Sequence, residues 1–184
     1  MLSSGQKNKG GYRIVIEDIL DTLYLHRVHL KLSGLDVSIL DDVPVIKEGG
    51  HQNIGKIIKY IKLSKDYVIW SREYNEVFSS VLMGGRLIDI ILGLEKLFLL
   101  SNFREVVNVV NAILTYTGGD ERRIALYFLN KDLIEDNKHF VLPPLVEEIA
   151  TTVVRVSKED EGFVMSVVKS MNRNLEGATF TVKS

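Results

Sequence analysis

Apolar and polar positions follow one another along the first two thirds of the chain in a way that predicts strands and helices in turn. The β-branched run 12–16 predicts a buried strand, and apolar positions at helical spacing over 18–32 predict a helix that Gly34 ends. Because strands alternate with helices, the pattern predicts a mostly parallel sheet with helices on both faces. The further predicted elements are strands at 37–40, 43–46, 67–70, 88–92 and 123–130, and helices at 55–63, 73–83 and 103–116.

The last third of the chain has a different pattern. Pro143 and Pro144 predict the start of a short helix that continues over 145–150. Three short strands follow with tight connections, which indicates an antiparallel edge next to the parallel sheet. These strands are predicted at 151–156, 163–169 and 179–182. No repeat or linker divides the chain, so the sequence predicts a single α/β domain over residues 1–184.

The composition narrows the classes of chemistry. Hydrophobic residues make up 46% and charged residues 26% of the chain, as in ordinary globular proteins. The net charge of −1 gives no overall attraction to nucleic acid or to an anionic membrane, so nucleic-acid binding is possible but not indicated. The chain has no cysteine, which excludes disulfides, thiol nucleophiles and cysteine-ligated zinc.

The sequence also predicts a protein that does not span a membrane. Its longest apolar stretch, 88–100, is short and is interrupted by Asp89, Glu95 and Lys96. The first ten residues are polar and do not form a signal peptide. A cytoplasmic location is therefore expected.

The end of the chain resembles a known family. The segments 145–156 and 167–173, followed by Gly177 and by 180–182, are similar to the closing helix, strand and hairpin of the RecA/KaiC/RadA ATPase core. The segments 16–23 and 92–98 resemble an uncharacterised archaeal family related to that core. The resemblance implies a RecA/KaiC-like sheet with helices on both faces and a C-terminal antiparallel β-hairpin at its edge.

The resemblance also shows which catalytic parts the chain lacks. A phosphate-binding loop would need a Lys and a Ser or Thr where Gly11 and Tyr12 stand, and no strand precedes them. The aspartate that holds magnesium in the family would fall near Gly93. We therefore expect no ATPase activity and no resident cofactor, with bound Mg-ATP as the alternative.

Four residues are candidates for a nucleotide site if one exists. Glu17 and Asp18, with Asp21 nearby, match the place of paired acids at a strand end in KaiC-like enzymes. The same carboxylates also suit the start of a helix, where they would cap exposed amides. Lys169 and Arg173 bracket the last hairpin, which in KaiC-like rings reaches a neighbouring subunit's nucleotide. The alternative for this pair is a solvated turn.

Two other patterns have simpler interpretations. His26 and His29 have a spacing that places them on one helix face, but no further zinc ligands accompany them. Lys56, Lys59 and Lys62 form a basic stripe on the predicted helix 55–63, as on an ordinary surface helix.

The sequence therefore predicts a non-catalytic interaction or scaffold module. A missing central strand would leave a gap or an open edge in the sheet, to which another segment could add a strand. The expected partner is a second copy in a homo-oligomer, or an extended segment of another protein. The alternative is a KaiC/RadA-like nucleotide- or DNA-binding protein with an atypical phosphate loop.

Overall fold

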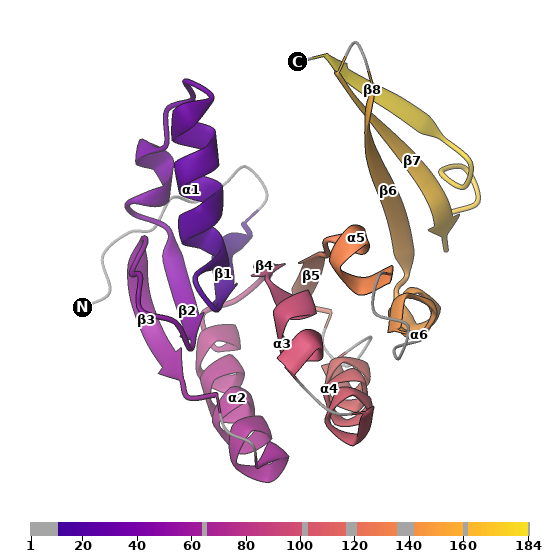
Figure 1. The fold of residues 1–184 in the computed structure, drawn as a ribbon. Coiled ribbons are helices and arrows are strands. Elements are labelled where there is room, and N and C mark those ends of the chain that lie inside the picture. The colour runs from indigo at the N-terminus through magenta and orange to yellow at the C-terminus, as the bar shows by residue number, and fades with distance from the viewer. Residues whose placement is uncertain are drawn as a thin grey trace. The chain divides into compact units, whose positions relative to one another are not determined.

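A computed structural model describes residues 11–63, 66–100, 103–116, 121–135, 142–159 and 162–183 (Figure 1). Its contacts divide the chain into an N-terminal unit that ends at residue 140 and a C-terminal unit that starts at residue 141. Both units combine helices with strands, so the predicted mixed α/β class is confirmed.

The N-terminal unit is built on a sheet of five parallel strands in the order β3-β2-β1-β4-β5. This is the strand order of doubly wound α/β sheets. The central strand β1 pairs with β2 on one side and β4 on the other, so the described sheet has no gap at its centre. The strands at the two ends of this order are β3 and β5. The strands are β1 (Arg13–Ile19), β2 (Pro44–Glu48), β3 (Lys56–Ile61), β4 (Leu87–Leu92) and β5 (Arg123–Phe128).

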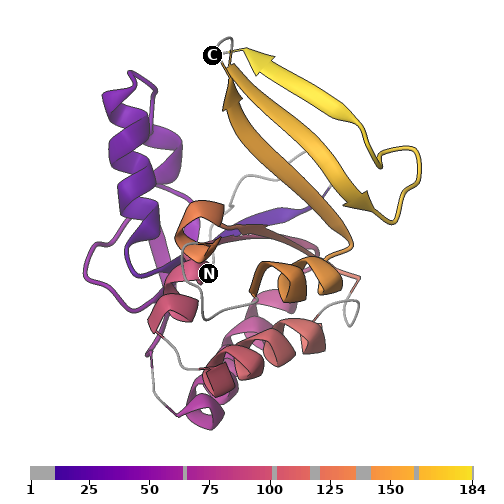
Figure 2. The same cartoon turned by 45° about the vertical axis from the view of Figure 1, so that its right-hand side comes forward.

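Helices lie on both faces of this sheet, as predicted. Successive residues of a strand point to opposite faces, so Val15 packs with α2 and α4 while Ile16 packs with α1. Figure 2 shows α4 alongside α2. The helices of this unit are α1 (Thr22–Leu32), α2 (Tyr67–Leu82), α3 (Leu94–Leu100), α4 (Phe103–Tyr116) and α5 (Lys131–Glu135).

The C-terminal unit consists of one helix and a three-stranded antiparallel sheet in the order β6-β7-β8. The antiparallel strands were predicted, and they form a sheet of their own. The helix ends under the amine of Lys169, which donates to the carbonyl oxygens of Glu147 and Glu148 at 2.8 and 2.9 Å. The elements are α6 (Leu142–Ile149), β6 (Thr152–Glu159), β7 (Gly162–Ser170) and β8 (Thr179–Lys183).

Several predicted elements are wrong. The segment 55–63 is not a helix but contains strand β3, and 67–70 is not a strand but the first turn of α2. Ser38–Leu40 is a short 3-10 helix rather than part of a strand. In β5 the apolar side chains of Ile124, Leu126 and Phe128 are exposed, although this strand was predicted to be buried.

The helix predicted from residue 18 begins four residues later. Strand β1 continues through Ile19, and Leu20 and Asp21 form a left-handed turn before Thr22 starts α1. None of the described helices combines the length and the apolar character that a membrane span needs.

Candidate functional site

Buried charged side chains lie along the central strands, and those of β1 and β2 lie at the carboxyl ends, where open α/β sheets bind ligands. Glu17 and Asp18 of β1, Lys47 and Glu48 of β2, and Asp89 of β4 are all buried. Because neighbouring residues of a strand face opposite sides of the sheet, these residues form two separate clusters. Asp18 and Lys47 lie on the side of α1, and the three other acids lie on the side of α2.

The cluster on the α1 side is centred on the amine of Lys47. Its Nζ lies 2.6 Å from Asp18 Oδ2 and 2.5 Å from Asp21 Oδ1. The other oxygen of Asp18, Oδ1, accepts a hydrogen bond from the backbone N–H of Leu23 at 2.9 Å. Asp18 therefore caps the first turn of α1, as the simpler of the two interpretations predicts.

The turn between β1 and α1 is strained. Leu20 and Asp21 have φ values of 51° and 61°, in the left-handed region that side chains other than glycine rarely adopt. Two contacts hold the turn: Leu20 donates its N–H to the carbonyl oxygen of Glu48 at 3.0 Å, and Lys96 Nζ donates to the carbonyl oxygen of Leu20 at 2.9 Å. Strained turns of this kind often mark functional sites.

The carboxylate of Asp21 occupies a position suited to an anion. It accepts backbone hydrogen bonds from His51 at 2.9 Å and Gln52 at 2.8 Å, in addition to the contact with Lys47. Burial alone would raise the pKa of Asp21, but its hydrogen bonds with Lys47, His51 and Gln52 lower this pKa to about 2. Gly50, with φ of +78°, lets the loop close here, since a Cβ on it would lie 2.4 Å from Asp21 Oδ1. The donors that could hold a phosphate are thus engaged by the chain itself.

The crevice between β1 and β4, where a doubly wound sheet would bind a nucleotide, is also filled. Gly93 follows β4 with φ of +87° and packs directly against the β1–α1 turn. A Cβ on Gly93 would lie 2.2 Å from Thr22 Oγ1 and 2.6 Å from the carbonyl oxygen of Ile19. The chain leaves no room for a ligand at this contact.

The cluster on the α2 side is organised by Arg123 of β5. Its guanidinium contacts Asp89 Oδ2 at 2.6 Å and Glu17 Oε1 at 3.3 Å, and it lies over the ring of Phe78. Tyr74 donates its hydroxyl to Glu17 Oε1 at 3.0 Å. Burial first, and then the carboxylates of Asp89 and Glu48, raise the pKa of Glu17 well above its usual value.

Glu48 completes this cluster. Its Oε2 accepts a hydrogen bond from Trp70 Nε1 at 3.2 Å, and burial raises its pKa to about 7. A cavity of about 20 Å³ beside Glu17, Glu48 and Tyr127 is large enough for roughly one water molecule, not for a substrate. The side chains of both clusters thus pair with one another within the N-terminal unit.

Of the other predicted site residues, Lys169 and Arg173 belong to the C-terminal unit. Lys169 caps α6, as described above, and Arg173 is exposed in the turn between β7 and β8. His26 and His29 lie on α1, and burial, with the nearby His29 and Lys96, lowers the pKa of His26. Within the described ranges, no group of three His, Asp or Glu residues is arranged to hold a metal ion.

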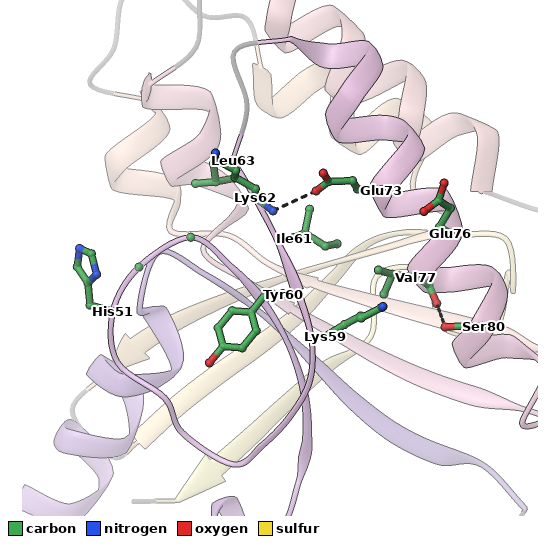
Figure 3. A pocket seen from close by; sticks show the side chains of 12 residues that line it. His51, Lys59, Tyr60, Ile61, Lys62, Leu63, Glu73, Glu76, Val77 and Ser80 are labelled. Atoms are coloured by element: carbon green, nitrogen blue, oxygen red, sulfur yellow. Dashed lines mark hydrogen bonds between the residues drawn. The ribbon is translucent and has the colours of Figure 1, made fainter.

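A surface groove of about 790 Å³ runs between the edge strand β3 and helix α2 (Figure 3). Lys59 and Lys62 line it from the side of β3, and Glu73 and Glu76 line it from α2. Its far end reaches Gly50 and His51 of the β2–β3 loop. Lys62 donates its backbone N–H to Glu73 Oε2 at 3.3 Å, which fixes the start of α2 beside the end of β3.

Comparisons with known proteins place the chain in a family. A family model described as a Pyrococcus protein of unknown function, DUF257, matches residues 4–181. A solved structure from Pyrococcus horikoshii is 39% identical, with a TM-score of 0.81, and the match covers 92% of this chain and 79% of that one. No curated protein matches the chain.

Proposed function

The chain belongs to the DUF257 family of Pyrococcus proteins of unknown function, and we propose that it is a non-catalytic interaction module that binds an extended protein segment. The segment adds a strand to the open edge of the parallel sheet at β3. We also propose that the chain is related to the RecA/KaiC core, because segments 145–156 and 167–173 resemble it, and that the protein is located in the cytoplasm.

One observation carries the proposal: among the described strands β3 pairs with β2 alone, and a groove lies between β3 and α2. About half of the N–H and C=O groups of an edge strand point away from the sheet, where an extended segment can hydrogen-bond to them. The groove beside them accommodates the alternate side chains of such a segment. Binding of this kind requires no catalytic residue.

The carboxyl ends of the strands support the non-catalytic part of the proposal. Glu17 and Asp18 are buried on opposite faces of the sheet, so they do not act together on one substrate. Asp21 engages the amides of His51 and Gln52 and the amine of Lys47, so these three donors are not available to a nucleotide phosphate.

The test uses a fluorescent ten-residue peptide of alternating valine and threonine, which favours the extended conformation. We expect fluorescence anisotropy to rise with protein concentration at micromolar strength. The control is the same peptide with N-methyl groups on alternate residues, which removes the donors that pairing needs. Equal binding of both peptides, or of neither, would contradict strand addition.

A further inference from the structure

We propose that the segment bound at the groove between β3 and α2 carries an acidic and a basic side chain two positions apart, an acid-x-base pattern. This inference rests on the proposed function and names the chemistry of the partner. Side chains two positions apart in an extended segment point to the same side, so both enter the groove. The acidic side chain pairs with Lys59, and the basic one pairs with Glu73 and Glu76.

The two walls of the groove carry opposite charges. The register of β3 with β2 places Lys59 on the same face as Ile46, the face that α2 covers. Helix α2 runs back along β3, so Glu73 lies beside the backbone N–H of Lys62, and Glu76 follows three residues later in the same groove (Figure 3). Lys59 and Glu76 are exposed, and neither takes part in an ion pair within the described part of the chain. Both charges are therefore available to a bound segment.

The floor of the groove suits a long basic side chain. Ile61 of β3 and Val77 of α2 line the groove and are buried, and both acids of α2 lie within four residues of Val77. Lysine and arginine lay their apolar stem on such a surface and keep the charged head at its rim. Ile61 lies two residues beyond Lys59, or roughly 7 Å along the strand. Because this is the distance between two same-side positions of an extended segment, it sets the acid-x-base spacing.

The lysines of β3 support the acidic position of the pattern. Lysines and bulges on an edge strand disfavour pairing with an arbitrary strand, and β3 contains Lys56, Lys59 and a bulge at Ile58. A segment that brings a carboxylate to Lys59 turns part of this barrier into an attraction, whereas an apolar or a basic segment does not. The charges of the groove therefore select among extended segments.

The first experiment compares fluorescent peptides by anisotropy. The host is the ten-residue valine–threonine peptide of the proposed function, with two alternate positions at its centre replaced. Two mixed peptides contain Glu-x-Arg or Arg-x-Glu, which allows for either direction of the bound segment, and two like-charged peptides contain Glu-x-Glu or Arg-x-Arg. A like-charged peptide always places one of its charges against a group of the same sign. We expect the better mixed peptide to bind wild type about tenfold tighter than either like-charged peptide.

The second experiment switches the preference. Lys59→Glu makes both walls of the groove acidic, so Arg-x-Arg should become the tightest peptide, by about tenfold over Glu-x-Arg and Arg-x-Glu. The matched control is Lys31→Glu, which makes the same change of net charge at the exposed end of α1. This control should keep the wild-type ranking of the peptides. Circular dichroism checks that both variants fold.

Three results would overturn the inference. They are a like-charged peptide that binds wild type as tightly as the mixed peptides, a ranking that Lys59→Glu leaves unchanged, and the same switch in Lys31→Glu. If Lys59→Glu does not fold, the ranking on wild type still decides. If the uncharged host peptide binds and the charged peptides show no ranking, the proposed function stands and only the charge pattern is wrong. If none of the peptides binds, both proposals fail.

Discussion

Lys47 and Asp18 form an ion pair with 2.6 Å between Nζ and Oδ2, and neither side chain is exposed to solvent. The pair joins the two strands β1 and β2 just before the β1–α1 turn. It also positions Asp18 to cap α1 and helps to hold Asp21 against the β2–β3 loop. The buried charges therefore maintain the strained turn between β1 and α1.

Replacing Lys47 should be strongly destabilising. Lys47→Met leaves Asp18 buried without its cation, and breaking a buried pair in this way costs about 3–5 kcal/mol of unfolding free energy. Lys56→Met is the matched control, because Lys56 forms an exposed pair with Asp42 and such pairs contribute roughly 0–1 kcal/mol. Urea unfolding of both variants measures the difference. Equal losses of unfolding free energy in the two variants would show that the buried ion pair stabilises the fold no more than the exposed one.

Gly93→Ala should disrupt the contact between β4 and the β1–α1 turn. The new Cβ would lie 2.6 Å from the carbonyl oxygen of Ile19, and the positive φ adds strain. Gly34→Ala has a similar φ of +79° but no atom within 4 Å, so its cost should be only about 1 kcal/mol. Thermal unfolding should rank Gly93→Ala well below Gly34→Ala. A similar loss of stability in both variants would mean that the space around Gly93 accommodates a Cβ.

The sequence predicts much of the fold because most elements have a clear periodicity. Strands β1, β4 and β5, helix α4 and the three C-terminal strands lie where the apolar pattern places them. The prediction for β3 fails because the bulge at Ile58 adds a residue between Ile57 and Lys59. This breaks the two-residue alternation and leaves Lys56, Lys59 and Lys62 at a spacing that mimics a helix.

The start of α2 could have been found from its cap. Asp66 accepts a hydrogen bond from the N–H of Val68 at 2.9 Å, a typical helix start. The four apolar residues 67–70 predict a strand when taken alone, because so short a run has no diagnostic helical period. Trp70 and Tyr74 show the helical spacing, since they lie four residues apart and the centroids of their rings are 5.2 Å apart.

The candidate site was only partly visible in the sequence. The sequence predicts that Glu17, Asp18 and Asp21 form a group, but it does not indicate that Glu17 and Asp18 lie on opposite faces of the sheet. The roles of Lys47, Glu48 and Arg123 were missed, because their partners come from distant strands. The sequence contains one sign of these roles, since the charged residues Lys47 and Glu48 directly follow an apolar run that predicts a strand.

Stability should fall as the pH rises from about 4.5 to about 7. Burial raises the pKa of Glu48 from 4.5 to about 7, and that of Glu17 rises in the same direction. The folded state then binds more protons than the unfolded state in this range, so each unit of pH lowers stability by up to about 1.4 kcal/mol per group. Glu48→Gln removes one of these groups and keeps the acceptor for Trp70.

The difference between wild type and Glu48→Gln isolates this effect. The lowered pKa of Asp21 affects the unfolding free energy only as the pH falls below about 3.8, the usual pKa of this side chain. The lowered pKa of His26 makes stability rise with pH, but it does so equally in wild type and variant. Denaturant unfolding at pH 5 and pH 8 should show wild type losing more stability than the variant. Parallel curves would mean that Glu48 is ionised throughout.

Mg-ATP should not bind to the chain. Calorimetric titration at millimolar nucleotide should give no heat of binding, because Asp21 already engages the amides of the β2–β3 loop. Lys169→Ala and Arg173→Ala should give the same result as wild type. Micromolar binding that either substitution abolishes would restore the nucleotide-site alternative for Lys169 and Arg173, and with it a role for Glu17 and Asp18.

The most direct measurement of the central claim is hydrogen–deuterium exchange of the chain with and without the saturating valine–threonine peptide. Strand addition predicts that amides of β3 exchange more slowly in the complex, while those of the central strand β1 are unchanged. Slowing confined to β5 or to the C-terminal strands, with β3 unaffected, would contradict the account.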